Sequence, residues 1–239
     1  MPLFYTRPRP VEPAAHGAKA LRDDPDHGFA ATTNAVPLNG VEFGLAQRSY
    51  PIVFSGQGAP FPVAILGLRT DENLFVTPAR RWIEGVYVPA YVRRYPFIFI
   101  EAANGQLILA VDEGGDFLVP EGRQRLFDAD GKPTQLVANA LKYCGAYQRN
   151  HKATVDFVAA LRAEKLLVEN RAQATIAGGE RIALAGFTVV DEARFNKLPA
   201  ETLLAWRDRG WLAWIYAHLM SFAAWDLLAA AAAERKKPA

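Results

Sequence analysis

The clearest pattern in the chain is a pair of apolar, β-rich runs at 97–101 and 106–112, separated by a short polar turn. The turn reads Ala-Asn-Gly at 103–105. An Asn-Gly pair between two such runs is the strongest short-range signal of a β-hairpin. We therefore predict an antiparallel hairpin in which Glu101 lies close to Leu107.

Further apolar runs predict the other strands. A second hairpin is expected from 171–177 and 181–185 around the pair Gly178-Gly179, and Gly186 leads from it into a strand at 187–191. The remaining predicted strands lie at 51–55, 62–69 and 74–76.

Spacings of three and four residues between apolar positions predict helices. The longest such pattern runs from about 134 to 167; Thr134 can cap it, and Gly145 or Asn150 can divide it into two helices. The segment 82–95 is rich in aromatic residues, which predicts an irregular or briefly helical structure. Other helices are expected at 35–47, 192–197, 200–208 and 211–234.

These elements predict an α+β fold, with antiparallel sheet and hairpins packed against long helices and a helical C-terminal segment. Prolines and the lack of an apolar run in residues 1–28 predict an extended or poorly ordered lead-in. We expect residues 29–234 to form a single domain, followed by a polar tail at 235–239.

Composition narrows the possible classes of protein. Among 239 residues, 27 Lys and Arg balance 25 Asp and Glu, a net charge of +2 that predicts no nucleic-acid partner. A single Cys excludes an intrachain disulfide and a Cys-rich metal site. Together with the absence of a signal-like N-terminus, this makes the cytoplasm the expected location.

The apolar segment 211–233 is long enough to cross a bilayer. It contains His218 and Asp226, however, and an acidic group in hydrocarbon is costly. We therefore expect a core helix and no stable membrane span. The aromatic residues of the predicted terminal helices indicate either a large core or a groove for a partner; they are Trp206, Trp211, Trp214, Tyr216, Phe222 and Trp225.

The chain lacks the strong catalytic motifs. No dinucleotide-binding or phosphate-binding glycine loop is complete, and no serine lies in a Gly-x-Ser-x-Gly sequence. The four histidines show no metal-ligand spacing, so we assign no metal ligands, and nothing indicates a particular cofactor. Cys144 falls on an apolar helical stripe and is expected to be buried.

Two stretches are the most informative about function. The first contains Tyr91, Arg93, Arg94 and Tyr95, with Trp82 before them. Paired arginines beside aromatic rings can bind a carboxylate or phosphate, so these five residues are our candidate ligand-binding residues.

The second stretch begins at Asp112, and the predicted hairpin can bring it near the arginines. Glu101, Asp112 and His218 are the weaker candidates for handling protons in a reaction. A structural cluster of ion pairs at the base of the hairpin explains the same charges without a function.

Several stretches in chain order resemble the SapC family, over roughly residues 30–230. The most characteristic are YVPAYVRRYPFIF at 87–99, FTVVDEARFNKLP at 187–199 and GWLAWIYAHLMS at 210–221; AVPL at 35–38, SYPIVF at 49–54, PVAILGLR at 62–69 and ENLFV at 72–76 complete the pattern. The resemblance implies a bacterial protein associated with surface-layer protein genes and their export. It supplies no catalytic residues.

Two main hypotheses follow. The first is an accessory protein that binds a polypeptide or surface-protein partner. The second is a peptide-modifying or hydrolytic enzyme that acts on an anionic substrate; a metal-assisted form would recruit His218 with carboxylates. Whether the protein is an enzyme stays open at this point, as does a homo-oligomer.

Overall fold

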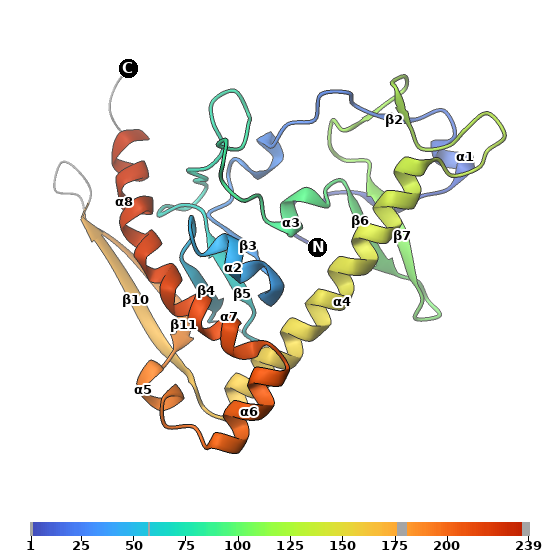
Figure 1. Ribbon diagram of the computed structural model, residues 1–239. Helices are drawn as coiled ribbons and strands as arrows, with labels where there is room; N and C mark the ends of the chain where they lie inside the picture. The colour runs from blue at the N-terminus through green and yellow to red at the C-terminus, as the bar shows by residue number, and fades with distance from the viewer. Residues whose placement is uncertain (1, 57, 176–180, 236–239) are drawn as a thin grey trace. The chain divides into compact units, whose positions relative to one another are not determined.

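The computed structural model describes residues 2–56, 58–175 and 181–235, and these form antiparallel sheets and helices, as expected for an α+β protein (Figure 1). The chain divides into two compact units rather than the single domain that we expected. Unit 1 comprises residues 1–30 and 91–149, and unit 2 comprises 31–90 and 150–239. Each unit has its own sheet and is described separately.

Unit 1 is built on the predicted hairpin. Strands β6 (Phe97–Glu101) and β7 (Leu107–Asp112) pair in antiparallel register, with Glu101 opposite Leu107 as predicted. Gly105 in the turn has a φ of 79°, a left-handed conformation that glycine adopts without strain. A third strand, β1 (Pro8–Pro10), pairs with β7 on its other side.

Residues 2–28 are therefore part of unit 1 and not a lead-in. Besides β1 they contain α1 (Pro13–His16) and β2 (Ala20–Leu21), which forms a small sheet with β8 (Leu118–Val119) and β9 (Gln124–Arg125). Tyr5 is 2% exposed, and its hydroxyl donates to the carbonyl of Phe97 at 2.7 Å. The prolines at 8 and 10 are accommodated because β1 is an edge strand.

Both faces of the β1-β7-β6 sheet are covered by apolar side chains. Alternate residues of β6 and β7 point to opposite faces, as the pleat of a strand requires. Phe97 and Val111 pack with Cys144 on one face, whereas Ile98 and Ala110 pack with Tyr5 on the other.

Helix α4 (Gln135–Ala163) is continuous, contrary to a division at Gly145 or Asn150. One glycine costs a helix about 1 kcal/mol relative to alanine. The packing of the helical residues before and after Gly145 can outweigh this cost. Thr134 precedes the helix, but its hydroxyl donates to the carbonyls of Arg125 and Leu126. Residues up to Arg149 belong to unit 1 and the remainder to unit 2.

Unit 2 contains a five-stranded antiparallel sheet in the order β10-β11-β4-β5-β3. The strands are β3 (Ala35–Pro37), β4 (Ile52–Ser55), β5 (Pro62–Ile65), β10 (Leu167–Thr175) and β11 (Arg181–Val190). The turn predicted at Gly178-Gly179 lies outside the described residues. At 74–76 the structure has an isolated bridge from Val76 to Trp82 instead of the predicted strand.

The helix predicted at 35–47 is wrong in its first half. Residues 35–37 form β3, because Pro37 disfavours a helical residue before it and the apolar edge of β5 is available for pairing. The helical part is limited to η2 (Gly40–Glu42) and α2 (Phe43–Ala46). In the aromatic segment 82–95, only α3 (Ala90–Arg93) is helical.

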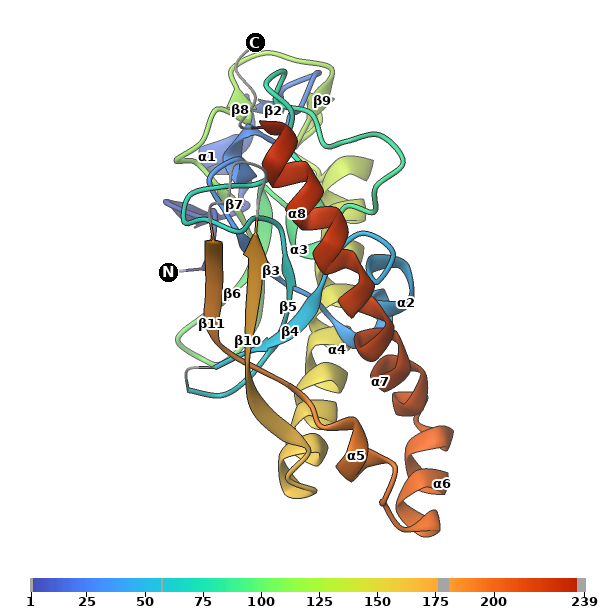
Figure 2. The same cartoon turned by 90° about the vertical axis from the view of Figure 1, so that its left-hand side faces the viewer.

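The terminal helices begin close to the predicted residues. They are α5 (Glu192–Phe195), α6 (Ala200–Asp208), α7 (Trp211–Met220) and α8 (Ala224–Arg235), with a 3₁₀ segment, η3 (Ser221–Ala223), between the last two. Helices α7 and α8 follow the same sheet, α7 near β11 and α8 near β10 (Figure 2). In the described part of the expected tail, the side chain of Arg235 donates to the carbonyls of Asn73 and Val76.

Candidate functional site

The two stretches singled out in the sequence both lie in unit 1, but their charges do not form one pocket. Glu101 is exposed at the turn end of β6, whereas the arginines precede the other end of that strand. The carboxylate of Glu101 is therefore not placed to act with Arg93 or Arg94.

Asp112 is buried and acts as a structural acceptor. Its carboxylate accepts from four donors: the backbone N–H groups of Thr6 at 3.1 Å and Arg7 at 2.6 Å, the hydroxyl of Tyr95 at 3.0 Å and, at a longer 3.5 Å, the hydroxyl of Thr6. Burial, and then the Asp112 charge, raise the pKa of Tyr95. Asp112 and Tyr95 thus connect the N-terminal segment to the hairpin, and this arrangement leaves neither group directed at a ligand.

Arg94 lies in a cage of tyrosines. Its guanidinium carbon is 4.1 Å from the ring centre of Tyr91, 4.4 Å from that of Tyr147 and 5.5 Å from that of Tyr5. Burial alone would lower the pKa of Arg94, but the three phenol groups outweigh it and raise the pKa. Arg94 therefore remains a cation, held by cation–π contacts.

A cleft of about 260 Å³ opens beside this cage, which we call the arginine cleft. Arg93, Arg94, Tyr143 and Cys144 are among the residues that line it. The Nε atom of Arg94 is buried without a hydrogen-bond partner, and no carboxylate among the described residues forms an ion pair with Arg94. Burial raises the pKa of the Cys144 thiol to about 11, so this group is a neutral thiol at physiological pH.

His218 and Trp82 both belong to unit 2 and are core residues. The Nε1 of Trp82 donates to the hydroxyl of Tyr50 at 3.0 Å. His218 is fully buried; its Nε2 accepts from the backbone N–H of Val190 at 3.1 Å, and its Nδ1 lies 2.8 Å from the carbonyl of Ile52.

These two partners assign the neutral tautomer with the proton on Nδ1. Burial lowers the pKa of His218 to about 4. Because both ring nitrogens are engaged by the backbone, His218 is available neither as a metal ligand nor as a base. Among residues 2–56, 58–175 and 181–235, no group of three or more His, Cys, Asp or Glu side chains could hold a metal ion.

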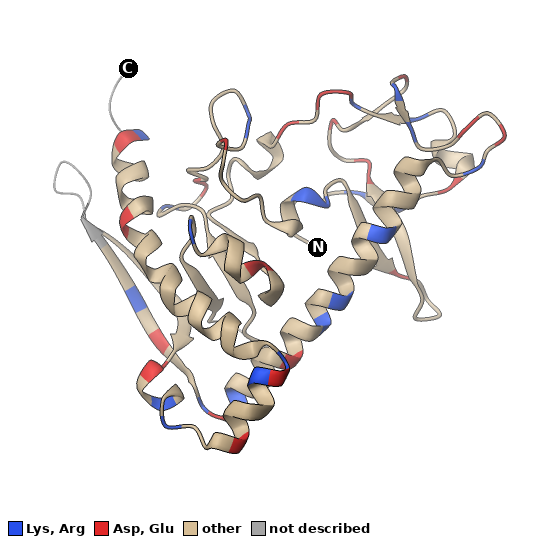
Figure 3. Cartoon of the chain, in the orientation of Figure 1, with Lys and Arg blue, Asp and Glu red and all other residues tan. Residues whose placement is uncertain are grey.

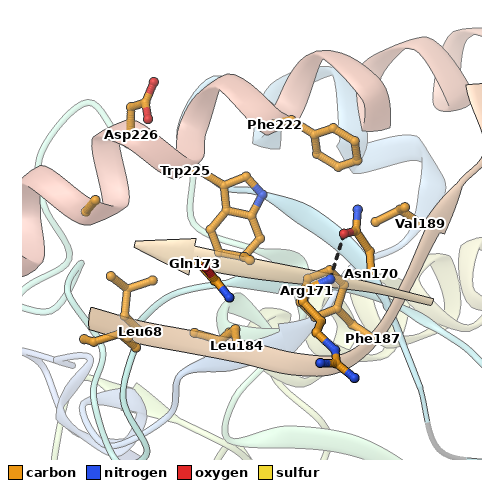
Figure 4. A pocket seen from close by; sticks show the side chains of 13 residues that line it. Leu68, Asn170, Arg171, Gln173, Leu184, Phe187, Val189, Phe222, Trp225 and Asp226 are labelled. Carbon is orange, nitrogen blue, oxygen red and sulfur yellow. Dashed lines mark hydrogen bonds between the residues drawn. The ribbon is translucent and has the colours of Figure 1, made fainter. Parts of the chain in front are cut away.

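A larger cleft, of about 410 Å³, lies in unit 2 between the β10–β11 hairpin and α8 (Figure 4). We call it the ribbon cleft. Leu184, Phe187 and Val189 of β11 form its apolar floor, and Phe222 and Trp225 face them from η3 and α8. Trp225 stacks on Phe187 with ring centres 6.1 Å apart. This volume and lining are typical of a binding site for a small ligand or a side chain.

Polar groups lie around this apolar floor: Asn170, Arg171 and Gln173 of β10, with Asp226 of α8. Sequence reasoning did not identify these residues of the hairpin. It did identify Phe222 and Trp225 as part of an aromatic group, and the structure divides that group between the cleft and the core. Trp206 and Trp211 are buried, and Trp214 packs on Phe43 and Phe157.

Strand β10 is an edge strand of its sheet. The N–H of Asp191 donates to the carbonyl of Leu166, whereas that of Val190 donates to His218 instead of crossing to β10. Hydrogen-bonded and non-hydrogen-bonded pairs alternate in an antiparallel ladder. Leu167 and Glu169 consequently direct their backbone N–H and C=O groups to the open edge.

A β-bulge limits this open edge. The register shifts between Asn170 and Ala172, where Arg171 lies opposite two residues of β11, one of them Gly186 with a φ of 83°. The side chain of Asn170 accepts from the N–H of Arg171 at 2.7 Å. The regular part of the exposed edge is therefore short and ends next to the ribbon cleft.

One helical stretch, Trp211–Arg235, is long and apolar enough to cross a membrane, although only 39% of its most apolar window is buried within the protein. Core helices of soluble proteins pass the same test. The inward face of this stretch places Ile215, His218 and Leu228 in the core of unit 2. These contacts are those of a core helix.

Comparison with known proteins identifies a family. A family model described as SapC matches residues 11–228, which includes most of the N-terminal segment that packs into unit 1. The searches of curated proteins and of solved structures found no match.

Proposed function

Since the chain belongs to the SapC family, we propose that it is an accessory protein that binds an extended segment of a polypeptide partner. The observation that supports this most directly is the open edge of β10 next to the ribbon cleft. Adding a strand to an exposed edge supplies main-chain hydrogen bonds, and pockets beside the edge select side chains. Both components are present in unit 2.

The geometry also indicates what kind of segment would fit. Leu167 and Glu169 offer outward backbone groups, and the bulge at Arg171 ends the pairing after a few residues. The partner segment would therefore be short and extended. The apolar floor of the cleft, with Phe187 and Trp225, favours a bulky apolar or aromatic side chain. The association of the family with surface-layer genes makes a surface-layer polypeptide, bound in the cytoplasm before export, the partner class that we propose.

Replacing Glu169 with proline should weaken peptide binding at least tenfold. Proline removes the outward N–H, and an edge strand tolerates it because that N–H is not part of the ladder. The probe is a peptide selected on the wild-type protein from a random displayed library, and its affinity is measured by calorimetry. Glu169→Ala is the matched control: it removes the same side chain, keeps the N–H and should bind within about twofold of wild type.

Two results would contradict this proposal. One is equal binding of the selected peptide to Glu169→Pro and Glu169→Ala. The other is a failure to select any peptide. Ala229 lines the cleft, so Ala229→Leu should reduce the preference for a bulky side chain while the backbone pairing remains.

The arginine cleft supports a second candidate function, the binding of an anionic group. Arg94 is partly buried, its Nε atom has no hydrogen-bond partner, and a charge removed from water is costly unless a counter-ion compensates it. The carboxylate of a ligand in the cleft would supply that charge. The candidate acid–base residues Glu101 and His218 do not lie in this cleft, and Asp112 is committed to its donors, so we propose binding there and no reaction.

We expect tetraglutamate to bind the wild-type protein, and Arg94→Met to weaken this binding at least tenfold. Methionine keeps the apolar stem of Arg94 and removes the charge. Arg149→Met is the matched control, because Arg149 is exposed on α4 outside the cleft. Binding is measured by calorimetry with tetraglutamine as the uncharged probe, and circular dichroism verifies that each variant is folded. Equal binding by both variants would contradict the proposal.

A further inference from the structure

The arginine cleft has a cationic part and an apolar part, and both belong to unit 1. Arg93 is the last residue of α3, and Arg94 follows it just before β6. Most of the remaining wall is apolar and comes from β2, the start of β6 and α4; it includes Leu21, Pro96, Phe97, Leu136, Ala140 and Cys144. A ligand in this cleft therefore meets positive charge and apolar surface together.

The apolar wall is part of the core of unit 1. Leu136, Ala140 and Cys144 follow one another at intervals of four residues, which places them along one side of α4. Ala140 and Cys144 are buried in the same cluster as Phe97 of β6, and Leu136 lies at the margin of that cluster, only partly buried. The fold thus holds this wall in place before any ligand binds.

The charges around the arginine cleft are of one sign. No Asp or Glu of the described residues lines it. Helix α4 contains no acidic residue before Asp156, and Figure 3 shows blue but no red along this part of the helix. The ribbon cleft differs, since Arg171 and Asp226 both line it. The arginine cleft therefore favours an anion, and the planar guanidinium group suits a carboxylate in particular.

The size of the cleft limits the rest of the ligand. Its volume of about 260 Å³ is below the roughly 300–1,000 Å³ of ordinary small-molecule sites, so it accommodates one group of the size of a side chain. A second negative charge on the ligand would lie against apolar surface and lose its hydration, which is costly. This favours a single carboxylate over a doubly charged phosphate.

We infer that the arginine cleft binds a monocarboxylate in which the carboxylate adjoins an apolar body, with the anion at Arg94 and the body against Phe97 and Leu136. The inference rests on the anion binding proposed above for the same cleft and adds the remainder of the ligand. Two sources share this chemistry. One is an apolar C-terminal residue of a polypeptide, and the other is a short-chain fatty acid.

Three small probes separate the contributions of charge and apolar body. N-acetylphenylalanine has both, N-acetylglycine lacks the body, and N-acetylphenylalanine amide lacks the charge. The first should bind the full chain with a dissociation constant on the order of 1 mM or below, and the other two at least tenfold more weakly, as measured by calorimetry.

The two weaker probes also distinguish two kinds of failure. If N-acetylglycine binds as tightly as N-acetylphenylalanine, the apolar body is not recognised, and the inference is wrong while the anion binding stands. If the amide binds as tightly as the acid, the anion binding itself is contradicted.

Octanoate identifies the source of the carboxylate. Binding of octanoate at least tenfold more tightly than N-acetylphenylalanine would assign a fatty acid, and the reverse would assign the C-terminal residue of a polypeptide. Similar affinities would support a site that accepts both. Octanoate and N-acetylphenylalanine that both bind no more tightly than acetate would overturn the inference.

Leu136→Ser should weaken the binding of N-acetylphenylalanine at least fivefold and leave that of tetraglutamate within about twofold, because it removes apolar wall and keeps Arg94. Leu141→Ser is the matched control: Leu141 is on the same helix, 51% exposed and outside the cleft. It should bind both ligands like the wild type, and circular dichroism verifies that both variants are folded. Equal effects of the two substitutions on N-acetylphenylalanine would contradict the position assigned to the apolar body.

Cys144 reports whether the ligand occupies this cleft, since it is the only cysteine of the chain and lines the wall. N-acetylphenylalanine at ten times its dissociation constant should slow the modification of Cys144 by methyl methanethiosulfonate at least fivefold, as followed by mass spectrometry. The same concentration should not slow it in Arg94→Met. A bound ligand that leaves the rate unchanged would place the binding elsewhere and overturn the assignment. A thiol that is not modified in the free protein would show that the cleft excludes small molecules, with the same consequence.

Discussion

Asp112→Ala is expected to lower the free energy of unfolding of unit 1 by about 5 kcal/mol, since its three closest donors lose a charged acceptor and each such hydrogen bond is worth about 1.5–3 kcal/mol. The donors are the N–H groups of Thr6 and Arg7 and the hydroxyl of Tyr95. Urea denaturation followed by circular dichroism measures the loss. Hydrogen exchange should show the largest increase in β1 and β7, which the carboxylate joins.

Two substitutions define the origin of this effect. Asp112→Asn keeps the shape of the side chain but brings an amide N–H₂ among donors, so it should also destabilise unit 1. Asp116→Ala is the control, because Asp116 is an exposed acid in the same stretch that pairs with Arg22 at 2.7 Å. Its loss should cost less than about 1 kcal/mol. A cost for Asp112→Ala as small as this would contradict the role assigned to the buried carboxylate.

Replacing His218 with alanine should destabilise unit 2 by about 3–5 kcal/mol, through a core cavity and two unpaired backbone groups. The imidazole joins β4 to β11 by way of the carbonyl of Ile52 and the N–H of Val190. All five tryptophans lie in unit 2, so their fluorescence in urea reports the unfolding of this unit.

The same histidine predicts a dependence of stability on pH. The pKa of His218 is lowered by burial from 6.5 to about 4 in the folded state. Between these values the unfolded chain binds a proton that the folded chain does not, so stability is full above pH 6.5 and falls as the pH decreases toward 4. The shift corresponds to a loss of about 3 kcal/mol.

His218→Gln isolates this contribution. Glutamine can accept from Val190 and donate to Ile52, but it does not titrate. The difference in unfolding free energy between wild type and His218→Gln should therefore change between pH 6.5 and 4 and be constant above that range. A difference that is independent of pH from 4 to 8 would show that His218 is not buried in its neutral form.

Local patterns predicted the elements that local interactions determine. The Asn-Gly turn was sufficient to place β6 and β7 in register, because the left-handed conformation of Gly105 and the facing apolar runs favour the same pairing. The start of α6 at Ala200 likewise agrees with the helix predicted at 200–208. In both cases the decisive residues are close together in the chain.

The candidate site in unit 1 depends on residues far apart in the chain, which is why the sequence did not predict its form. Arg94 was expected near acidic groups, but it lies among the rings of Tyr5 and Tyr147, each about 50 or more residues away. Asp112 was expected to face the arginines and instead accepts from Thr6 and Arg7. Both outcomes depend on how the N-terminal segment packs into unit 1. No local sequence pattern predicts that packing.

The sequence contains only a weak signal of the ribbon cleft. Exposed polar residues at 170, 171 and 173 lie on β10, in the hairpin that contains Gly186 with its left-handed backbone. Their position relative to Trp225 became evident only from the fold, because α8 is more than forty residues further along the chain.

The division of the chain between the two units has a consequence for how the protein is made. The backbone passes from one unit to the other after residues 30, 90 and 149, so neither unit is formed by a single continuous segment of the chain. During synthesis, unit 1 is complete once residue 149 has left the ribosome. Strand β4 is synthesised much earlier, but its partner β11 is complete only after residue 190. Until then, the apolar edge of β4 that pairs with β11 is open and must be protected from pairing with other chains.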